Sequence, residues 1–163
     1  MRTPLLDDAT AMTLTGRPAV TKPLFVLPLP NVGDMIQFHF PSSWNHFAPD
    51  HVISFRLLPI SPTEIELVTR WLVHKDAVEG VDYDLNALTE VWTATNSQDM
   101  FLVERNQQGV ASPACAPGPY SATHEDGAIQ FIGWYSTTIG KRVDSAAAGA
   151  ARRSSKRKHV AVA

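Results

Sequence analysis

The sequence contains a single cysteine, Cys115, among its 163 residues. No disulfide can therefore form within the chain. One cysteine also excludes a structural zinc site built from four cysteines, or from two cysteines and two histidines. An iron–sulfur cluster held by two cysteines and two histidines is excluded for the same reason. If the protein works with such a cluster, the cluster must lie outside this sequence.

Long apolar runs and a secretory leader are also missing. No stretch approaches the ~20 apolar residues that a membrane-spanning helix needs. At the N-terminus, Asp7 and Asp8 stand where a signal peptide would be apolar, and Pro4 interrupts any early helix. We therefore expect a cytoplasmic protein without a membrane partner.

Charge is unevenly distributed along the chain. Residues 1–140 carry a net charge of −8, whereas residues 141–163 carry +6. The basic run Arg152–Lys158 is compatible with a nucleic-acid or membrane-surface contact. However, residues 143–163 are mostly Ala, Ser, Arg and Lys, with too little large apolar surface to repay the entropy of ordering. We favour a disordered tail over residues 143–163 and expect no nucleic-acid partner.

The N-terminal region, residues 1–34, is rich in proline. Because proline fixes φ and lacks a backbone donor, long regular elements are not expected there. We predict an extended segment with short strand pieces over 11–14 and 24–27. The five prolines are Pro4, Pro18, Pro23, Pro28 and Pro30.

Residues 35–142 have the pattern of a domain core. Alternating or β-branched-rich stretches over 35–40, 51–58 and 64–74 predict strands, and short links between them favour antiparallel pairing. A long helix is then predicted between Asp84 as N-cap and Gly109 as stop signal. A second helix is expected to start at 125–127, with an apolar stripe at helical spacing. The stripe residues are Ala128, Phe131, Ile132, Tyr135 and Ile139.

One carboxylate, Asp99, falls on the apolar stripe of the long helix. The stripe follows steps of three and four residues, so its members share one face. A buried carboxylate must be paired, hydrogen-bonded or bound to a metal, or it takes up a proton. From spacing alone, a nearby Arg or backbone donors, a metal ligand role, and an exposed Asp99 all stay open. The stripe is Leu85, Leu88, Trp92, Thr95, Asp99, Leu102 and Asn106, with Asn96 and Gln98 beside Asp99.

Several motifs in order resemble the α subunits of Rieske-type non-haem iron oxygenases. The resemblance covers roughly residues 10–140. Two upstream motifs look like the subgroup that acts on glycine betaine, choline and carnitine. The motifs are Leu58–Thr63, Trp71–Tyr83, Thr89–Asp99 with Glu104, Gln107–Val110 and Ser112, Pro117–Ser121, and Glu125, Phe131, Trp134 and Tyr135.

This resemblance implies an α+β fold of the helix-grip (START/Bet v 1-like) type, with an antiparallel sheet around a long C-terminal helix. In the family, two histidines and one aspartate hold a mononuclear Fe(II), and Asp99 matches that aspartate. Asn96 and Gln98 are candidates for supporting it. The facial arrangement leaves positions open for O₂. Family enzymes receive NAD(P)H-derived electrons through a flavin/iron-sulfur reductase and a [2Fe-2S] Rieske cluster, and commonly form homotrimers.

The two family histidines and the Rieske domain lie upstream of the region that this sequence matches. The local histidines, His39, His46, His51 and His74, do not have the family's spacing, and we expect them to be edge or solvated residues. We therefore expect a C-terminal fragment that alone binds no iron tightly and is inactive. Its partner would be the missing N-terminal Rieske portion or a separate chain.

A quaternary ammonium substrate would lie against aromatic faces, because its methyl groups offer no donors. The aromatic candidates are Trp44, Phe55, Trp71, Trp92 and Trp134. The expected reaction is hydroxylation, or oxidative N-demethylation, with O₂. Two alternatives stay open, a non-catalytic helix-grip module that binds a small ligand, and a non-functional remnant.

Overall fold

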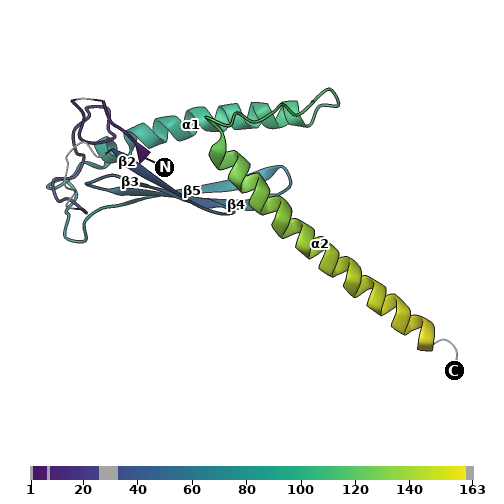
Figure 1. Ribbon diagram of the computed structural model, residues 1–163. Coiled ribbons are helices and arrows are strands. Elements are labelled where there is room, and N and C mark those ends of the chain that lie inside the picture. Colours follow the sequence, from purple (N-terminus) through teal and green to yellow (C-terminus); the bar gives the residue numbers. More distant parts are fainter. Residues whose placement is uncertain (1, 7, 26–32, 161–163) are drawn as a thin grey trace. The chain divides into compact units, whose positions relative to one another are not determined.

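The computed structural model describes residues 2–6, 8–25 and 33–160. The chain divides into two compact units, Met1–Cys115 and Ala116–Ala163. The first unit contains a sheet and helix α1, and the second contains helix α2 (Figure 1). The expected boundaries at residues 34 and 142 differ from this division and stay predictions. No helix among the described residues combines the length and apolarity needed to cross a membrane.

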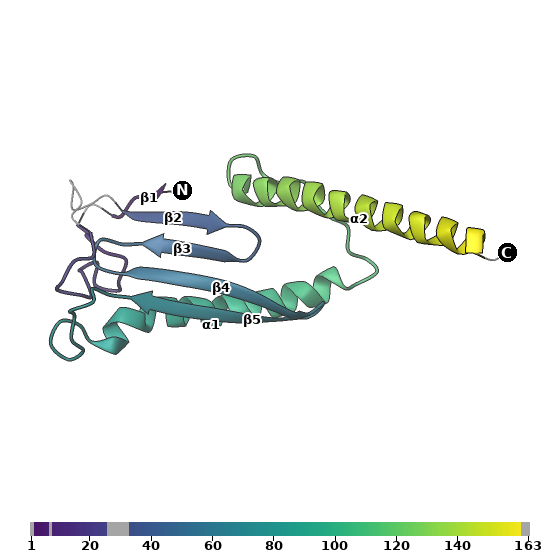
Figure 2. The ribbon, with the colours of Figure 1, turned by 90° about the horizontal axis from the view of Figure 1, so that it is seen from below.

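The sheet of the first unit has five strands in chain order, and every neighbouring pair is antiparallel (Figure 2). The predicted α+β fold with an antiparallel sheet is confirmed. Three predicted strands are present with small shifts at their ends, while β3 was not predicted. The strands are β1 (Arg2–Thr3), β2 (Asp34–His39), β3 (Ser43–Phe47), β4 (Val52–Ser61) and β5 (Glu64–Leu72).

Helix α1 (Leu85–Val110) lies across one face of the sheet, along β4 and β5 (Figures 1 and 2). Asp84 caps it as predicted, because its carboxylate accepts a hydrogen bond of 2.9 Å from the Ala87 N–H. Gly109 does not have the positive φ of a glycine stop. The helix therefore continues past it to Val110 and ends at Ala111.

Strand register places two rows of side chains on the face that α1 covers. The face is identified by Thr69, whose Oγ1 accepts a hydrogen bond of 3.1 Å from Asn96 Nδ2 of α1. Because side chains alternate along each strand, every second residue shares that face. One row is Ile36, His46, Ile53 and Trp71, and the next is Phe38, Trp44, Phe55 and Thr69.

The N-terminal segment forms turns and bends over residues 11–17. The expected strand at 11–14 is therefore wrong, because its polar groups bond locally: the Thr10 N–H donates to the Gly16 carbonyl at 2.8 Å. Residues 26 and 27 of the other expected strand piece lie outside the described residues, and 24–25 are not in a strand.

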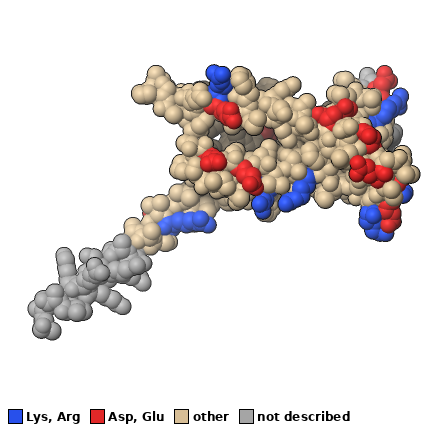
Figure 3. Space-filling model, turned by 180° about the vertical axis from the view of Figure 1, so that it is seen from behind, with Lys and Arg blue, Asp and Glu red and all other residues tan. Residues whose placement is uncertain are grey.

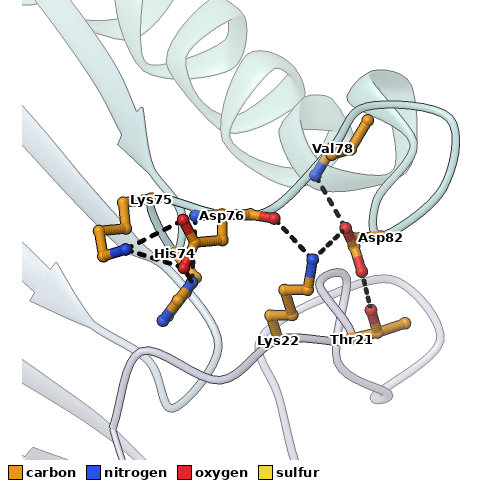
Figure 4. Close-up of polar contacts among 7 residues, drawn as sticks. All are labelled: Thr21, Lys22, His74, Lys75, Asp76, Val78 and Asp82. Atoms are coloured by element: carbon orange, nitrogen blue, oxygen red, sulfur yellow. Dashed lines mark hydrogen bonds and ion pairs between the residues drawn. The ribbon is translucent and has the colours of Figure 1, made fainter.

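A polar cluster fastens this N-terminal segment to the loop before α1 (Figure 4). Lys22 Nζ lies 2.9 Å from Asp82 Oδ2 and donates to the Asp76 carbonyl at 2.6 Å. Thr21 Oγ1 and the Val78 N–H also donate to the Asp82 carboxylate. The Lys22 and Val78 hydrogen bonds hold the pKa of Asp82 below its ordinary value. The cluster thus joins two parts of the chain that are about 60 residues apart in sequence.

Helix α2 (Asp126–Val160) begins where the sequence predicts. Phe131 stacks on Tyr135 with ring centroids 5.8 Å apart and lies 5.9 Å from Trp134. The helix extends through 143–160, part of the segment for which the composition predicts disorder. Ala, Arg and Lys are strong helix formers, which accounts for helical geometry in a stretch of such low hydrophobicity.

Candidate functional site

The N-terminal half of α1 covers the sheet closely. The ring of Trp92 lies 5.1 Å from that of Phe55 and 4.5 Å from that of His46, between ring centroids. Phe55 also stacks on Trp44 at 4.8 Å. Leu88 and Phe55 are only 5% and 1% exposed. We call this region, defined by Leu88, Trp92, Phe55 and His46, the closed end of the helix–sheet interface.

A buried Asp–His pair lies beneath Trp92. His46 Nδ1 is 2.5 Å from Asp34 Oδ2, and both side chains are buried. The carboxylate therefore orients the imidazole ring against α1. The expectation that His46 is an edge or solvated residue is wrong, because β3 was not predicted and places His46 on the helix-covered face.

A second buried pair, Asp50 and His51, immediately precedes β4. His51 Nδ1 lies 3.1 Å from Asp50 Oδ1, and both side chains are buried. Asp50 Oδ2 accepts from the N–H groups of Ala19 and Val20 at 2.7 and 3.1 Å. Burial alone would raise the pKa of Asp50, but His51 and these two donors outweigh it and lower that pKa. The expectation of a solvated His51 is also wrong.

Four of the five aromatic candidates belong to the first unit and lie on or against the helix-covered face. Trp44, Phe55 and Trp92 are in contact. Trp71 occupies the same row as His46. The indole N–H groups of Trp71 and Trp92 are buried and have no hydrogen-bond partner among the described residues. Trp134 belongs to the second unit, whereas the other four belong to the first.

Asp99 lies on α1 as predicted, but its side chain is exposed. Of the alternatives that the helical spacing left open, an exposed Asp99 is the one found in the structure. The reason lies in the surroundings, because Ile65 and Leu67 of the facing strand are themselves 53% and 40% exposed. Gln98 is also exposed, whereas half-buried Asn96 bonds Thr69. The role of Asp99 as a metal ligand stays a prediction, as do those of Asn96 and Gln98.

The described residues do not fit a complete iron site. No three His, Cys, Asp or Glu side chains in residues 2–6, 8–25 and 33–147 are placed to hold one metal ion. The buried pairs at His46 and His51 each join one imidazole to one carboxylate. A site with two histidines and one carboxylate therefore needs ligands beyond those described.

Comparison with known proteins identifies the family. Residues 3–141 match the model of the ring-hydroxylating α subunit, catalytic domain. This chain belongs to that family. The match includes strands β2 to β5 and all of α1.

The similar proteins are named as glycine betaine monooxygenase oxygenase subunits. The subunit of Chromohalobacter salexigens is 48% identical over 146 residues, which are 90% of this chain and 33% of that protein. The subunits of two Pseudomonas aeruginosa strains are each 52% identical over 136 residues, covering 83% of this chain and 32% of theirs. The chain thus spans about a third of the length of these relatives. Non-haem iron and a Rieske cluster follow from the family.

Proposed function

We propose that this chain forms the C-terminal part of the catalytic domain of an oxygenase acting on a quaternary ammonium compound of the glycine betaine type. The reaction would be hydroxylation of an N-methyl group with O₂, which ends in loss of formaldehyde. The observation that carries the proposal is the 48% identity with a glycine betaine monooxygenase subunit over 90% of the chain.

In this proposal Asp99 is the one iron ligand that the described chain supplies. It lies seven residues after Trp92, which is about 10 Å along the helix axis and nearly the same direction around it. The exposed carboxylate would therefore stand beside the closed end, accessible to ligands from outside this chain. Those ligands, the Rieske cluster and the reductase would come from other polypeptide, and a homotrimer in the cytoplasm is the proposed working form.

The aromatic side chains of the closed end support a cationic substrate. Half-buried Trp44 and Trp92 pack around the buried Phe55 on the helix-covered side of the sheet, and a trimethylammonium group is attracted to such aromatic faces. Trp71, in the neighbouring row of the sheet, and Trp134, in the second unit, remain weaker candidates. On this basis the substrate's cationic end would bind between the aromatic rings and Asp99.

The test joins this chain to the part it lacks relative to its family. The upstream two-thirds of the Chromohalobacter salexigens subunit would be fused to this chain, and iron content and formaldehyde release from glycine betaine would be measured with the reductase. In the fusion, Asp99→Asn should lower both iron content and turnover by about a hundredfold or more, because a first coordination ligand is lost.

The matched control is Glu104→Gln, an equally conservative change at an exposed acidic residue on the same helix. It lies away from the Asp99 stripe, so iron and turnover should stay at the level of the unchanged fusion. Normal iron content in the Asp99→Asn fusion would contradict the ligand assignment. Substrate binding without formaldehyde release in the unchanged fusion would favour a non-catalytic binding module.

A further inference from the structure

The C-terminal half of α1 has an apolar side that the rest of the first unit leaves uncovered. Around the helix axis, three side chains lie within roughly 80° of Trp92, which points toward the sheet. They are Met100, Leu102 and Val103. They are nevertheless 60%, 65% and 55% exposed. Phe101, 62% exposed, points the opposite way and carries the Arg105 guanidinium 5.1 Å from its ring centroid.

The strand facing this half of the helix is uncovered as well. Ile65 and Leu67 share the face of Thr69, since strand residues two apart point the same way. Apolar residues of the helix and of the strand thus lie on facing sides, and all of them are at least 40% exposed. Figure 3 shows the surface hollowed on this side of the molecule. We call the surface formed by Met100, Leu102, Val103, Ile65 and Leu67, with Asp99 in its wall, the slot.

The closed end shows how the same helix and strands behave when they are covered. There the stripe residue Leu88 is 5% exposed. Beyond the polar stripe residues Thr95 and Asp99, apolar side chains resume at Met100, Leu102 and Val103, so this part of the helix also has an apolar side. A contiguous exposed apolar surface of this kind marks an interaction site.

We propose that the slot binds an apolar segment of the remaining oxygenase polypeptide, whether that polypeptide is continuous with this chain or separate. The inference rests on the proposed function and names the surface through which the other part joins this one. The matched region is only 32–33% of each of the three relatives, so each holds a large amount of further polypeptide able to fill the slot. A second copy of this chain is a less suitable occupant, because it would present a slot of its own rather than a segment that fills one.

The test measures association rather than turnover. The upstream two-thirds of the Chromohalobacter salexigens subunit, ending before the region matched by this chain, would be tagged and co-expressed with the full 163-residue chain. The two should co-purify. Leu102→Lys should weaken the complex by about tenfold or more, because it would bury an unpaired charge.

The matched control is Phe101→Lys, the neighbouring residue of similar exposure on the opposite side of the helix. It should change the affinity by less than about twofold, since it lies outside the slot. Circular dichroism of both variants alone should match the parent chain, because neither side chain is buried. Leu67→Lys tests the strand side of the slot and should behave like Leu102→Lys.

The outcomes separate this proposal from the proposed function. A complex that forms and depends on Leu102 but releases no formaldehyde supports the slot and contradicts the function. An active complex that tolerates both Leu102→Lys and Leu67→Lys overturns the slot. Failure to co-purify, or a dimer of the chain alone that Leu102→Lys converts to a monomer, also overturns it.

Discussion

The two ends of the α1–sheet interface are built from similar residues but differ in what covers them. At the closed end Phe55 is 1% exposed and Leu88 is 5% exposed. At the slot Leu102 is 65% exposed and Ile65 is 53% exposed, although both belong to the same helix and sheet. The closed end therefore stabilises the described chain, whereas in our proposal the slot adds stability once the remaining oxygenase polypeptide covers it. Substitutions at the two ends should separate these roles.

The largest difference is expected between Phe55→Ala and Leu102→Ala. Phe55→Ala removes a buried ring in contact with Trp44 and Trp92 and should lower the free energy of unfolding by about 3–5 kcal/mol. Leu102→Ala removes an exposed side chain and should change it by less than about 0.5 kcal/mol. Urea denaturation of the isolated chain, followed by circular dichroism, measures both. Equal losses would mean that the slot is already packed in solution.

A smaller effect is expected at Asp50, whose buried carboxylate anchors the N-terminal segment. Asp50→Asn should lower the free energy of unfolding by about 2 kcal/mol at neutral pH, because bonds to a charged acceptor are weakened. The folded-state pKa of Asp50 lies below 3.8, its ordinary value. Its contribution is thus fully present above that value and is lost as pH falls through the folded-state pKa.

The pH dependence gives this prediction a readout of its own. Denaturation midpoints measured from about pH 6 down to about pH 3 should converge for the parent chain and Asp50→Asn, since protonation removes the same charge. Glu90→Gln, at an exposed position of α1, is the matched control. Its denaturation midpoint should change with pH in the same way as that of the parent chain. If the difference in denaturation midpoint between the parent chain and Asp50→Asn stays constant on acidification, the carboxylate charge of Asp50 does not stabilise the fold.

Local signals in the sequence predicted the elements whose determinants are local. Asp84 has the side chain of an N-cap, and α1 starts directly after it. Alternation over 64–74 predicted β5, which spans Glu64–Leu72. The order of several motifs also predicted the family. This prediction depends only on which residues occur in the sequence, and so it did not require knowledge of the fold.

Features that depend on tertiary packing could not be predicted from local signals. β3 contains Trp44, Asn45 and His46. It lacks the apolar–polar alternation of a strand, because the residue buried on its covered face is the polar His46, which contacts Asp34. The stripe through Asp99 has the spacing of a buried face, yet its second half is exposed. Helical spacing indicates which side of a helix suits burial, but not whether the described chain supplies the covering surface.

The smallest expected effects lie at the two termini of α1. Asp84→Ala should lower the free energy of unfolding by about 1 kcal/mol, since the Ala87 N–H loses its acceptor. Gly109→Ala should instead raise it by up to about 1 kcal/mol, because Gly109 has helical geometry and no atom within 4 Å of an added Cβ. If the last turns of α1, beside the slot, fray in the isolated chain, Gly109→Ala will not raise the free energy of unfolding, while Asp84→Ala will still lower it. Adding the upstream polypeptide should then restore the gain, since covering the slot would hold those turns in the helix.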